Sequence, residues 1–326
     1  MDTQSAGRSI ASSPPFTATG RQRLMRGARG SSKSRSESLA AYLFLAPYLL
    51  VLLVFLIITA LFGVGLSFFR IDIGFTGPTF VGWRNYTLLF KELTHPMLSD
   101  FWTSMLNIMK FAFFVVIGQT MLALLLALLL QSVRRARGLL RTIFYIPAVT
   151  SSVATSLIFL WLYNPDGIIN YLLSLIHISG PNWLNDVFWA LPALMLLNIW
   201  TTAAAFMIYF LAALQDLPKE LLEAASVDGA SRLQIFWYIT VPLLRPTIFL
   251  VVALGTIGAF QMFDQAKFMT DGQPLNSTLT PMLEIYKEGF LNGRFGQAAA
   301  MSVMLFLIIF IVTIIQRRLL DPSARH

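Results

Sequence analysis

The stretch "ELLEAASVDGASRLQIFWYITVPLLRP", Glu220 to Pro246, is a long segment with charged and polar residues in the second half of the chain, and strongly apolar segments flank it on both sides. The 326 residues are 56% apolar and only 12% charged, with a mean hydropathy of +0.68. An average soluble domain has roughly 25% charged residues. The composition therefore predicts an all-α integral membrane protein, in which this stretch is a polar, helix-forming arm between two membrane segments.

Long apolar runs give the number of membrane helices, because a bilayer core takes about 20 apolar residues per helix. Six such runs predict six transmembrane helices, at about 40–69, 102–132, 142–163, 187–213, 243–264 and 297–316. A further apolar piece, "IINYLLSLIHIS", contains Asn170 and His177 and is expected to be interfacial or re-entrant. The transmembrane domain is expected over 39–320, with a disordered basic tail at 1–38 and a short C-terminal tail at 321–326.

The distribution of basic residues predicts the orientation. If both termini lie inside, 17 of the 24 Lys and Arg residues fall in cytoplasmic segments and six fall outside, while Lys110 lies just within the second span. The positive-inside rule then places both termini and the arm in the cytoplasm. The net charge of +8 is explained by topology, so nucleic acid is not expected as a partner.

The arm, at 216–242, has the local signals of two short helices joined by a bend. Asp228-Gly229 is a strong turn signal, and Ser231 followed three residues later by Gln234 is a capping box. The first helix is expected in "LPKELLEAASV" and the second in "RLQIFWYI", with its end before Pro242.

The second helix of the arm carries more large apolar groups than a free cytoplasmic loop needs. They are Leu233, Phe236, Trp237 and Tyr238. Two interpretations follow: the arm lies on lipid headgroups as an interfacial helix, or it docks onto another protein.

The segment "EAASVDGASRLQIFWYITVPLLRP" resembles the EAA signature of inner-membrane permease subunits of binding-protein-dependent ABC importers. Glu223, Ala224, Ala225, Gly229 and Pro242 fall at the positions of that pattern. The stretches "FVGWRNY", "YIPAVTSSV", "LYNPDGIIN" and "FGQAAAMSVMLFLIIF" are similar to the carbohydrate branch, which includes maltose-type and glycerol 3-phosphate permeases. The resemblance covers about residues 40–320, and it departs at 270–274, where "TDGQP" replaces the usual "TGGGP".

The resemblance implies the role and the partners of the chain. It implies a multi-pass protein of the bacterial inner membrane whose EAA loop, between the fourth and fifth helices, fits a cleft of a cytoplasmic ATPase subunit. The coupling residues would be Glu223, Ala224, Ala225, Asp228, Gly229 and Pro242. The implied partners are a second, homologous permease subunit, two ATPase subunits and an extracytoplasmic solute-binding protein, besides membrane lipid. ATP and Mg would bind the ATPase subunits, because this chain has no G-x-x-x-x-G-K-[ST] loop; we expect it to bind no cofactor and not to be an enzyme.

Polar groups inside spans are costly and tend to face a cavity, although hydrogen bonding between helices is the competing explanation. Hydroxyl and amide groups beside aromatic rings suit a sugar. The candidates for the solute path are Asn107, Ser152, Thr155, Asn198, Trp200, Thr202, Thr256, Gln261, Phe263 and Asp264.

Two other classes of function are weighed against the importer subunit. An ion-coupled secondary carrier normally has a carboxylate or histidine near the membrane midplane, whereas Asp264 and Lys110 lie near span ends. A membrane-embedded enzyme needs a nucleophile with a base, or metal ligands, at one depth. Cysteine is absent and the three histidines are scattered, so we expect no metal site.

Overall fold

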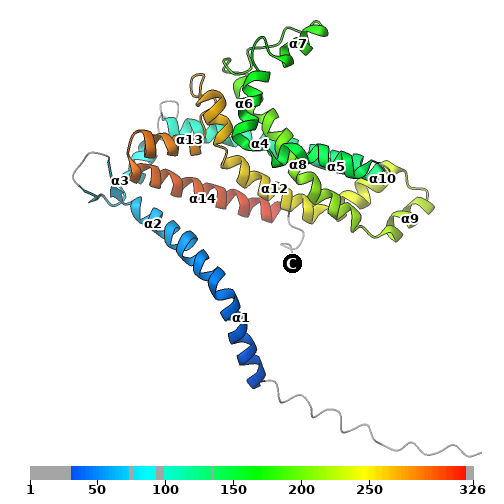
Figure 1. Cartoon of the computed structure of the whole chain (residues 1–326), viewed down its shortest axis with the longest axis horizontal. Coiled ribbons are helices and arrows are strands. Elements are labelled where there is room, and N and C mark those ends of the chain that lie inside the picture. Colours follow the sequence, from blue (N-terminus) through cyan, green and yellow to red (C-terminus); the bar gives the residue numbers. More distant parts are fainter. Residues whose placement is uncertain (1–30, 73–76, 93–98, 134–135, 321–326) are drawn as a thin grey trace, which may run out of the picture. The chain divides into compact units, whose positions relative to one another are not determined.

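The computed structural model describes residues 31–72, 77–92, 99–133 and 136–320 (Figure 1). Two short strands, β1 and β2, pair antiparallel at Phe69–Arg70 and Thr79–Phe80. The helices are α1 (Ser31–Leu52), α2 (Thr59–Leu66), α3 (Arg84–Glu92), α4 (Asp100–Ser132), α5 (Arg137–Val149), α6 (Ser152–Leu162), α7 (Ile168–Leu175), α8 (Ala190–Gln215), α9 (Lys219–Val227), α10 (Arg232–Ile235), α11 (Val241–Leu243), α12 (Arg245–Phe260), α13 (Pro281–Tyr286) and α14 (Phe295–Leu320). Wider π-helical turns occur at Leu53–Ile58, Phe236–Thr240, Ala266–Thr270 and Lys287–Leu291.

The chain divides into two compact units, Met1–Leu61 and Phe62–His326. In the first unit, α1 begins at Ser31, so the last residues of the segment expected as a disordered tail are helical. Residues 1–30, which make up the rest of that tail, lie outside the described residues, as do residues 321–326. The apolar helix Ala40–Leu66 corresponds to the first predicted span, and none of its apolar window is buried.

Within the described residues, four helices are long and apolar enough to cross a membrane, and up to six spans result if each of two bent helix pairs counts as one. The four are Ala40–Leu66, Asp100–Ser132, Ala190–Gln215 and Phe295–Leu319. They agree with the first, second, fourth and sixth predicted spans. The mostly helical membrane class is therefore confirmed, and the described residues contain four to six candidate spans.

The third predicted span, 142–163, is not one straight helix. It consists of α5 and α6, which meet at an angle of 95° at Thr150 and Ser151. Pro147 lies in the last turn of α5, where it has no N–H to donate and so weakens the helix just before the bend.

The fifth predicted span, 243–264, also differs from the structure. Its helix, α12, is only Arg245–Phe260, and it meets the preceding helix Arg232–Leu243 at 65°. Asp264, expected near the end of this span, lies beyond a break at Gln261–Phe263, in a separate short helical segment.

The core of the second unit is the packing of α4 against α8, with α12 on both. Small buried residues allow the close approach: Ala123 and Ala127 of α4, and Ala203 and Ala204 of α8, are at most 2% exposed. A side chain at Gly118 of α4 would press on Ile199 of α8. The bundle is therefore held by close contact between helix backbones.

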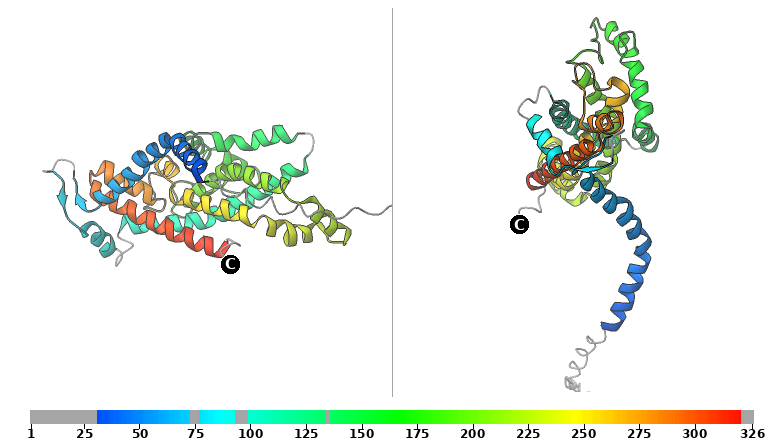
Figure 2. Two further views of the ribbon diagram at one scale, coloured as in Figure 1. Left: turned by 90° about the horizontal axis from the view of Figure 1, so that it is seen from below. Right: turned by 90° about the vertical axis from the view of Figure 1, so that its left-hand side faces the viewer.

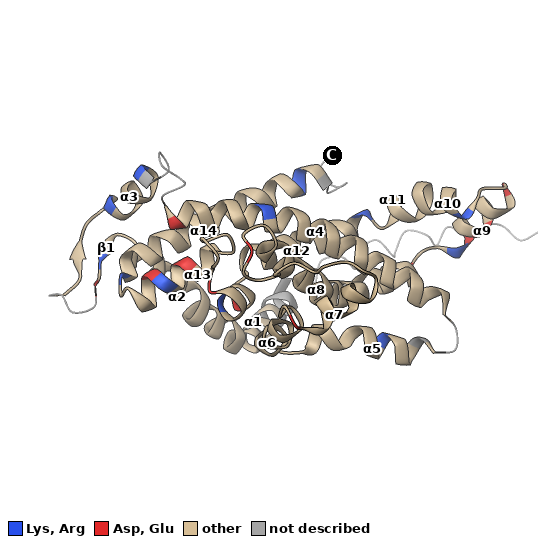
Figure 3. Cartoon of the chain, turned by 90° about the horizontal axis from the view of Figure 1, so that it is seen from above, with Lys and Arg blue, Asp and Glu red and all other residues tan. Residues whose placement is uncertain are grey.

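The polar connections of the second unit lie at opposite ends of this bundle. The views of Figures 1 and 3 place α9 and α10 at one end, and α3, β1 and α13 at the other. The eight-residue helix α7, in the piece expected to be interfacial or re-entrant, is not among the candidate spans.

Candidate functional site

The arm between α8 and α12 is a bent pair of helices that extends from one end of the bundle (Figure 2). Its first helix, α9, has no buried residue. Glu223 and Ala224 are exposed, and neither Glu223 nor its neighbour Glu220 forms a salt bridge within the described part of the chain. A carboxylate on this helix is therefore available to a group from another molecule.

The spacing between Ala225 and Gly229 is set by the hydrogen bonds that end α9. The amide of Ala230 donates to the carbonyl of Ala225 at 3.0 Å, and the amide of Gly229 donates to the carbonyl of Ser226 at 3.2 Å. These two bonds form a Schellman motif, which requires a left-handed residue after the helix cap. Gly229 supplies it with φ +82°, so the predicted turn is present and the cap residue is Asp228.

The second helix of the arm starts as the sequence predicts and ends later. Ser231 and Gln234 form both hydrogen bonds of the capping box. The helix continues through Pro242 to Leu243, so its expected end before Pro242 is wrong. The Phe236–Thr240 turn is π-helical, with the Val241 amide donating to the Phe236 carbonyl, and this wider turn accommodates the missing N–H of Pro242.

Leu244, at the bend after this helix, connects the arm to the bundle. Its side chain is 1% exposed and belongs to a buried cluster with Leu130 of α4 and Leu214 of α8. Pro246, two residues on, cannot donate the next helical hydrogen bond, which favours the 65° bend at this position. Sequence reasoning missed Leu244, because nothing in the pattern separates it from its apolar neighbours.

The exposed side of the arm is apolar as well as charged. Val227 is 87% exposed, Tyr238 79% and Leu233 68%. Exposed apolar groups gathered along the arm indicate a surface that another molecule covers.

Five of the ten predicted solute-path residues form side-chain hydrogen bonds inside the protein. Asn107 donates to the carbonyls of Asn276 and Leu279 and so holds the loop that includes "TDGQP". Thr202 donates to the side-chain oxygen of Gln119 at 2.6 Å, which links α8 to α4.

The other interhelical bonds involve residues from three further segments. Asn198 donates to Gln265 at 3.2 Å, and Thr256 accepts from Gln316 at 2.7 Å. Sequence reasoning missed the partners Gln265 and Gln316. Amide and hydroxyl side chains at similar depths in two different predicted spans would have been the sequence signal for such pairs.

The remaining candidates lie in different surroundings. Ser152 is exposed, and buried Thr155 donates to the Ser151 carbonyl. Trp200 is 45% exposed and contacts Phe159. Phe263 and Asp264 are half-buried, with the ring of Phe263 5.3 Å from that of Tyr286. The structure therefore does not bring the ten candidates into one cavity.

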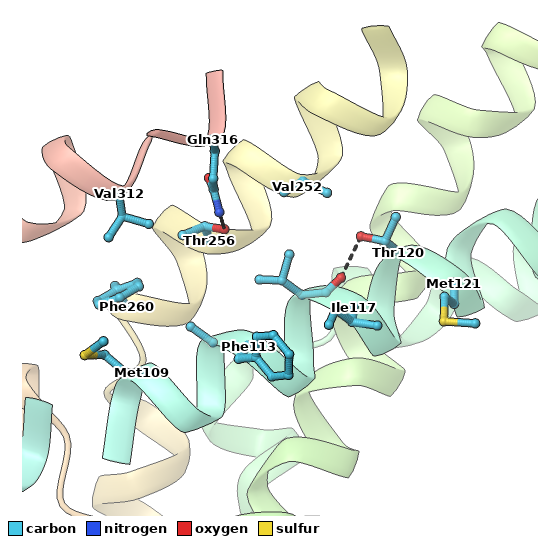
Figure 4. Close-up of a pocket in the computed structure, with 12 residues that line it drawn as sticks. Met109, Phe113, Ile117, Thr120, Met121, Val252, Thr256, Phe260, Val312 and Gln316 are labelled. Carbon is cyan, nitrogen blue, oxygen red and sulfur yellow. Dashed lines mark hydrogen bonds between the residues drawn. The ribbon is translucent and has the colours of Figure 1, made fainter. Parts of the chain in front are cut away.

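Two grooves lie along different faces of α12. The first, of about 520 Å³, lies between α4, α12 and α14 (Figure 4). Its walls are apolar except where the hydrogen bond between Thr256 and Gln316 and the Thr120 hydroxyl interrupt them.

The second groove, of about 690 Å³, lies between α12, α13 and α14 and is more mixed in character. Gln261, Ser302 and Thr313 supply polar groups to it. Phe306 and Phe310 also line it, with stacked rings 6.1 Å apart. Of the ten candidates, only Thr256 lines the first groove and only Gln261 the second.

The described fold is a helical bundle with four to six candidate membrane spans and a helix pair at one end. The profile of binding-protein-dependent transport system inner membrane components matches residues 119–326. The chain belongs to this family, and it is the permease subunit of an ABC importer.

Named relatives agree with this assignment. The arabinooligosaccharides transport system permease protein AraP of Bacillus subtilis is 33% identical over 288 residues, which cover 87% of this chain and 89% of that protein. The trehalose/maltose transport system permease protein MalF of Thermococcus litoralis is 33% identical over 281 residues, 86% of this chain and 92% of that protein. These relatives give no support to an ion-coupled carrier.

A solved structure has the same fold. A chain of a bacterial alginate ABC transporter, crystallised in complex with an alginate pentasaccharide-bound periplasmic protein, aligns with a TM-score of 0.75 at 22% identity. The alignment covers 90% of this chain and 97% of that chain.

Proposed function

We propose that this subunit forms half of the membrane path for a sugar or sugar-like solute, and that its arm receives the work of ATP hydrolysis. A second, homologous permease subunit completes the path, and an extracytoplasmic binding protein delivers the solute. Two cytoplasmic ATPase subunits bind ATP and Mg and contact the arm, which lies in the cytoplasm with both termini. Relatives named for arabinooligosaccharides and for trehalose and maltose support the solute class.

The geometry of the arm is the observation that carries this proposal. Two short helices are fixed to each other by the Schellman motif at Gly229 and by the capping box at Ser231. Leu244, buried among α4 and α8, then connects the pair to the bundle. A force on the arm would therefore reach the membrane helices as a rigid-body movement.

Docking on a protein explains the arm better than contact with lipid headgroups. An interfacial helix needs one apolar face and basic residues along the other. Here α9 instead presents two exposed carboxylates, Glu220 and Glu223, which anionic headgroups would repel. A carboxylate beside Ala224 and Ala225 suits a charge-assisted hydrogen bond with a closely approaching protein.

The mixed groove beside α12 is the proposed wall of the solute path. A sugar needs hydrogen-bond partners for its hydroxyls and flat rings for its faces. Gln261 provides the first, and the stacked Phe306 and Phe310 provide the second. In the apolar groove between α4, α12 and α14, Thr120, Thr256 and Gln316 form hydrogen bonds within the protein.

Substitution of Glu223 tests the coupling role. In the assembled transporter, Glu223→Ala is expected to abolish most of the ATP hydrolysis stimulated by solute-loaded binding protein, because a charged hydrogen bond is lost. Glu220→Ala, one turn earlier and also exposed, is the matched control and keeps most of the stimulated hydrolysis. Equal stimulation in the two variants, with equal amounts of complex in the membrane, would refute the docking role of Glu223.

A further inference from the structure

At the end of the bundle opposite the arm, three segments meet around a polar groove of about 220 Å³. They are the strand β1 with the residues after it, the start of α3 and the start of α14. Buried Asn85 donates to the carbonyls of Ser67 and Phe69, and the Phe295 amide donates to the Ile71 carbonyl. The backbone of this groove is therefore fixed by internal hydrogen bonds.

Three arginines line the groove, and they are not equivalent. Arg70 pairs with Asp72 at 2.6 Å, and Arg294 pairs with Glu288 at 2.9 Å. Arg84 is exposed and has no carboxylate partner within the described part of the chain. Three guanidinium groups and two carboxylates leave the groove with one excess positive charge, located on Arg84.

We expect the groove at the depth where lipid meets water. The apolar helix Ala40–Leu66 ends just before Arg70 in the sequence, and the apolar helix Phe295–Leu319 begins within the groove. Phe80 and Trp83, next to the groove in sequence, are 71% and 68% exposed. Exposed aromatic side chains beside basic ones are typical of the headgroup level of a membrane.

We propose that this groove binds the phosphate of an anionic phospholipid headgroup. Arg84 donates hydrogen bonds to the phosphate, Arg70 and Arg294 add positive charge on either side, and Trp83 lies against the upper part of the lipid. Guanidinium groups match phosphate oxygens in geometry, and a net positive groove favours an anionic lipid over a zwitterionic one. We assign a lipid because the exposed rings of Phe80 and Trp83 can contact its apolar part, whereas a free anion has no apolar part for them to contact.

Lipid binding to the purified transporter, measured by native mass spectrometry, tests this site. Phosphatidylglycerol is titrated against phosphatidylcholine with the wild-type complex and with Arg84→Gln. Because one basic residue near a membrane surface contributes about 1 kcal/mol, Arg84→Gln is expected to weaken the tightest phosphatidylglycerol site about fivefold. Arg141→Gln removes an exposed arginine from α5 and is the charge-matched control, with no change expected at that site. Equal phosphatidylglycerol binding in wild type and Arg84→Gln would overturn the proposal.

Two further experiments distinguish a lipid headgroup from a free anion in solution. Trp83→Ala should weaken phosphatidylglycerol binding and leave the binding of soluble glycerol phosphate unchanged. If glycerol phosphate competes as tightly as the lipid, the groove is a site for free anions and the lipid assignment is wrong. If Arg84→Gln keeps the lipid but weakens docking of the binding protein, the groove recognises an acidic protein surface, which also overturns the proposal.

Discussion

The α4–α8 bundle and the arm of α9 and α10 are both helical, yet different forces hold them. Thirteen residues of α4 are buried, whereas α9 has none. The helices of the bundle are fixed by packing against one another. Those of the arm are fixed by local hydrogen bonds at Gly229 and Ser231. An element that keeps its shape without burial is suited to receive a partner.

The largest expected effect is on folding, and it separates the two regions. Phe210 of α8 is fully buried, so Phe210→Ala should lower the unfolding free energy by about 3–5 kcal/mol. Trp237→Ala, in the arm, should change it by less than about 0.5 kcal/mol, because Trp237 is 58% exposed. Thermal unfolding of the detergent-solubilised subunit measures both. A similar loss of unfolding free energy in the two variants would contradict the proposed difference between the bundle and the arm.

The buried hydrogen bond between α4 and α8 gives a smaller effect. Thr202→Val leaves the side-chain oxygen of Gln119 without its donor, and Gln119 is 1% exposed. We expect a loss of about 1–3 kcal/mol in unfolding free energy, the typical cost of a buried unsatisfied group. Thr142→Val is the control, because its hydroxyl bonds only within α5 and is exposed. A stability equal to wild type in Thr202→Val would show that the bond contributes nothing.

Gly229 tests how the arm keeps its bend. Its φ of +82° is unfavourable for a residue with a side chain, and no atom would clash with an added Cβ. Gly229→Val should therefore destabilise the folded arm by about 1–2 kcal/mol through backbone strain alone. Gly229→Asn should destabilise it less, because asparagine tolerates left-handed geometry. Stimulated ATP hydrolysis in the assembled transporter should fall in the first variant more than in the second. The reverse order would contradict the role of the Schellman motif.

The smallest effect concerns the two grooves beside α12. Gln261→Ala should raise the KM of solute uptake about two- to tenfold, the value of one hydrogen bond of about 0.5–1.5 kcal/mol. Thr120→Val alters the apolar groove, where the hydroxyl bonds to the Val116 carbonyl, and should leave KM unchanged. An increase in KM with Thr120→Val alone would move the solute path to the groove of Figure 4.

The sequence predicted elements whose cause is local. Apolar length located four long spans, and the capping box and the left-handed Gly229 follow from residues next to one another. The 95° bend between α5 and α6 and the 65° bend before α12 were not predicted, because an apolar run gives the length of a helix and not its direction. For this reason the sequence predicts one span where α5 and α6 form two helices, and a helix end before Pro242 where the structure has the bend at Leu244.

The candidate path residues were harder to predict for a physical reason. A polar residue in a span satisfies its hydrogen bonds either with solute or with a neighbouring helix, and the sequence alone does not distinguish the two. Thr202 and Asn198 bond to Gln119 and Gln265, which are distant in the chain. Gln261 is exposed to a groove because α12 ends just before it.

Protection of the arm by the ATPase subunits is the most direct test of the central claim. The natural chain has no cysteine, so Val227→Cys, at a position 87% exposed on the arm, introduces a single thiol. We predict that a water-soluble maleimide labels this thiol in the subunit alone, both in detergent and in lipid bilayers. Labelling should be blocked when the ATPase subunits are bound. Protection by the bilayer alone, or full labelling in the assembled transporter, would contradict the account.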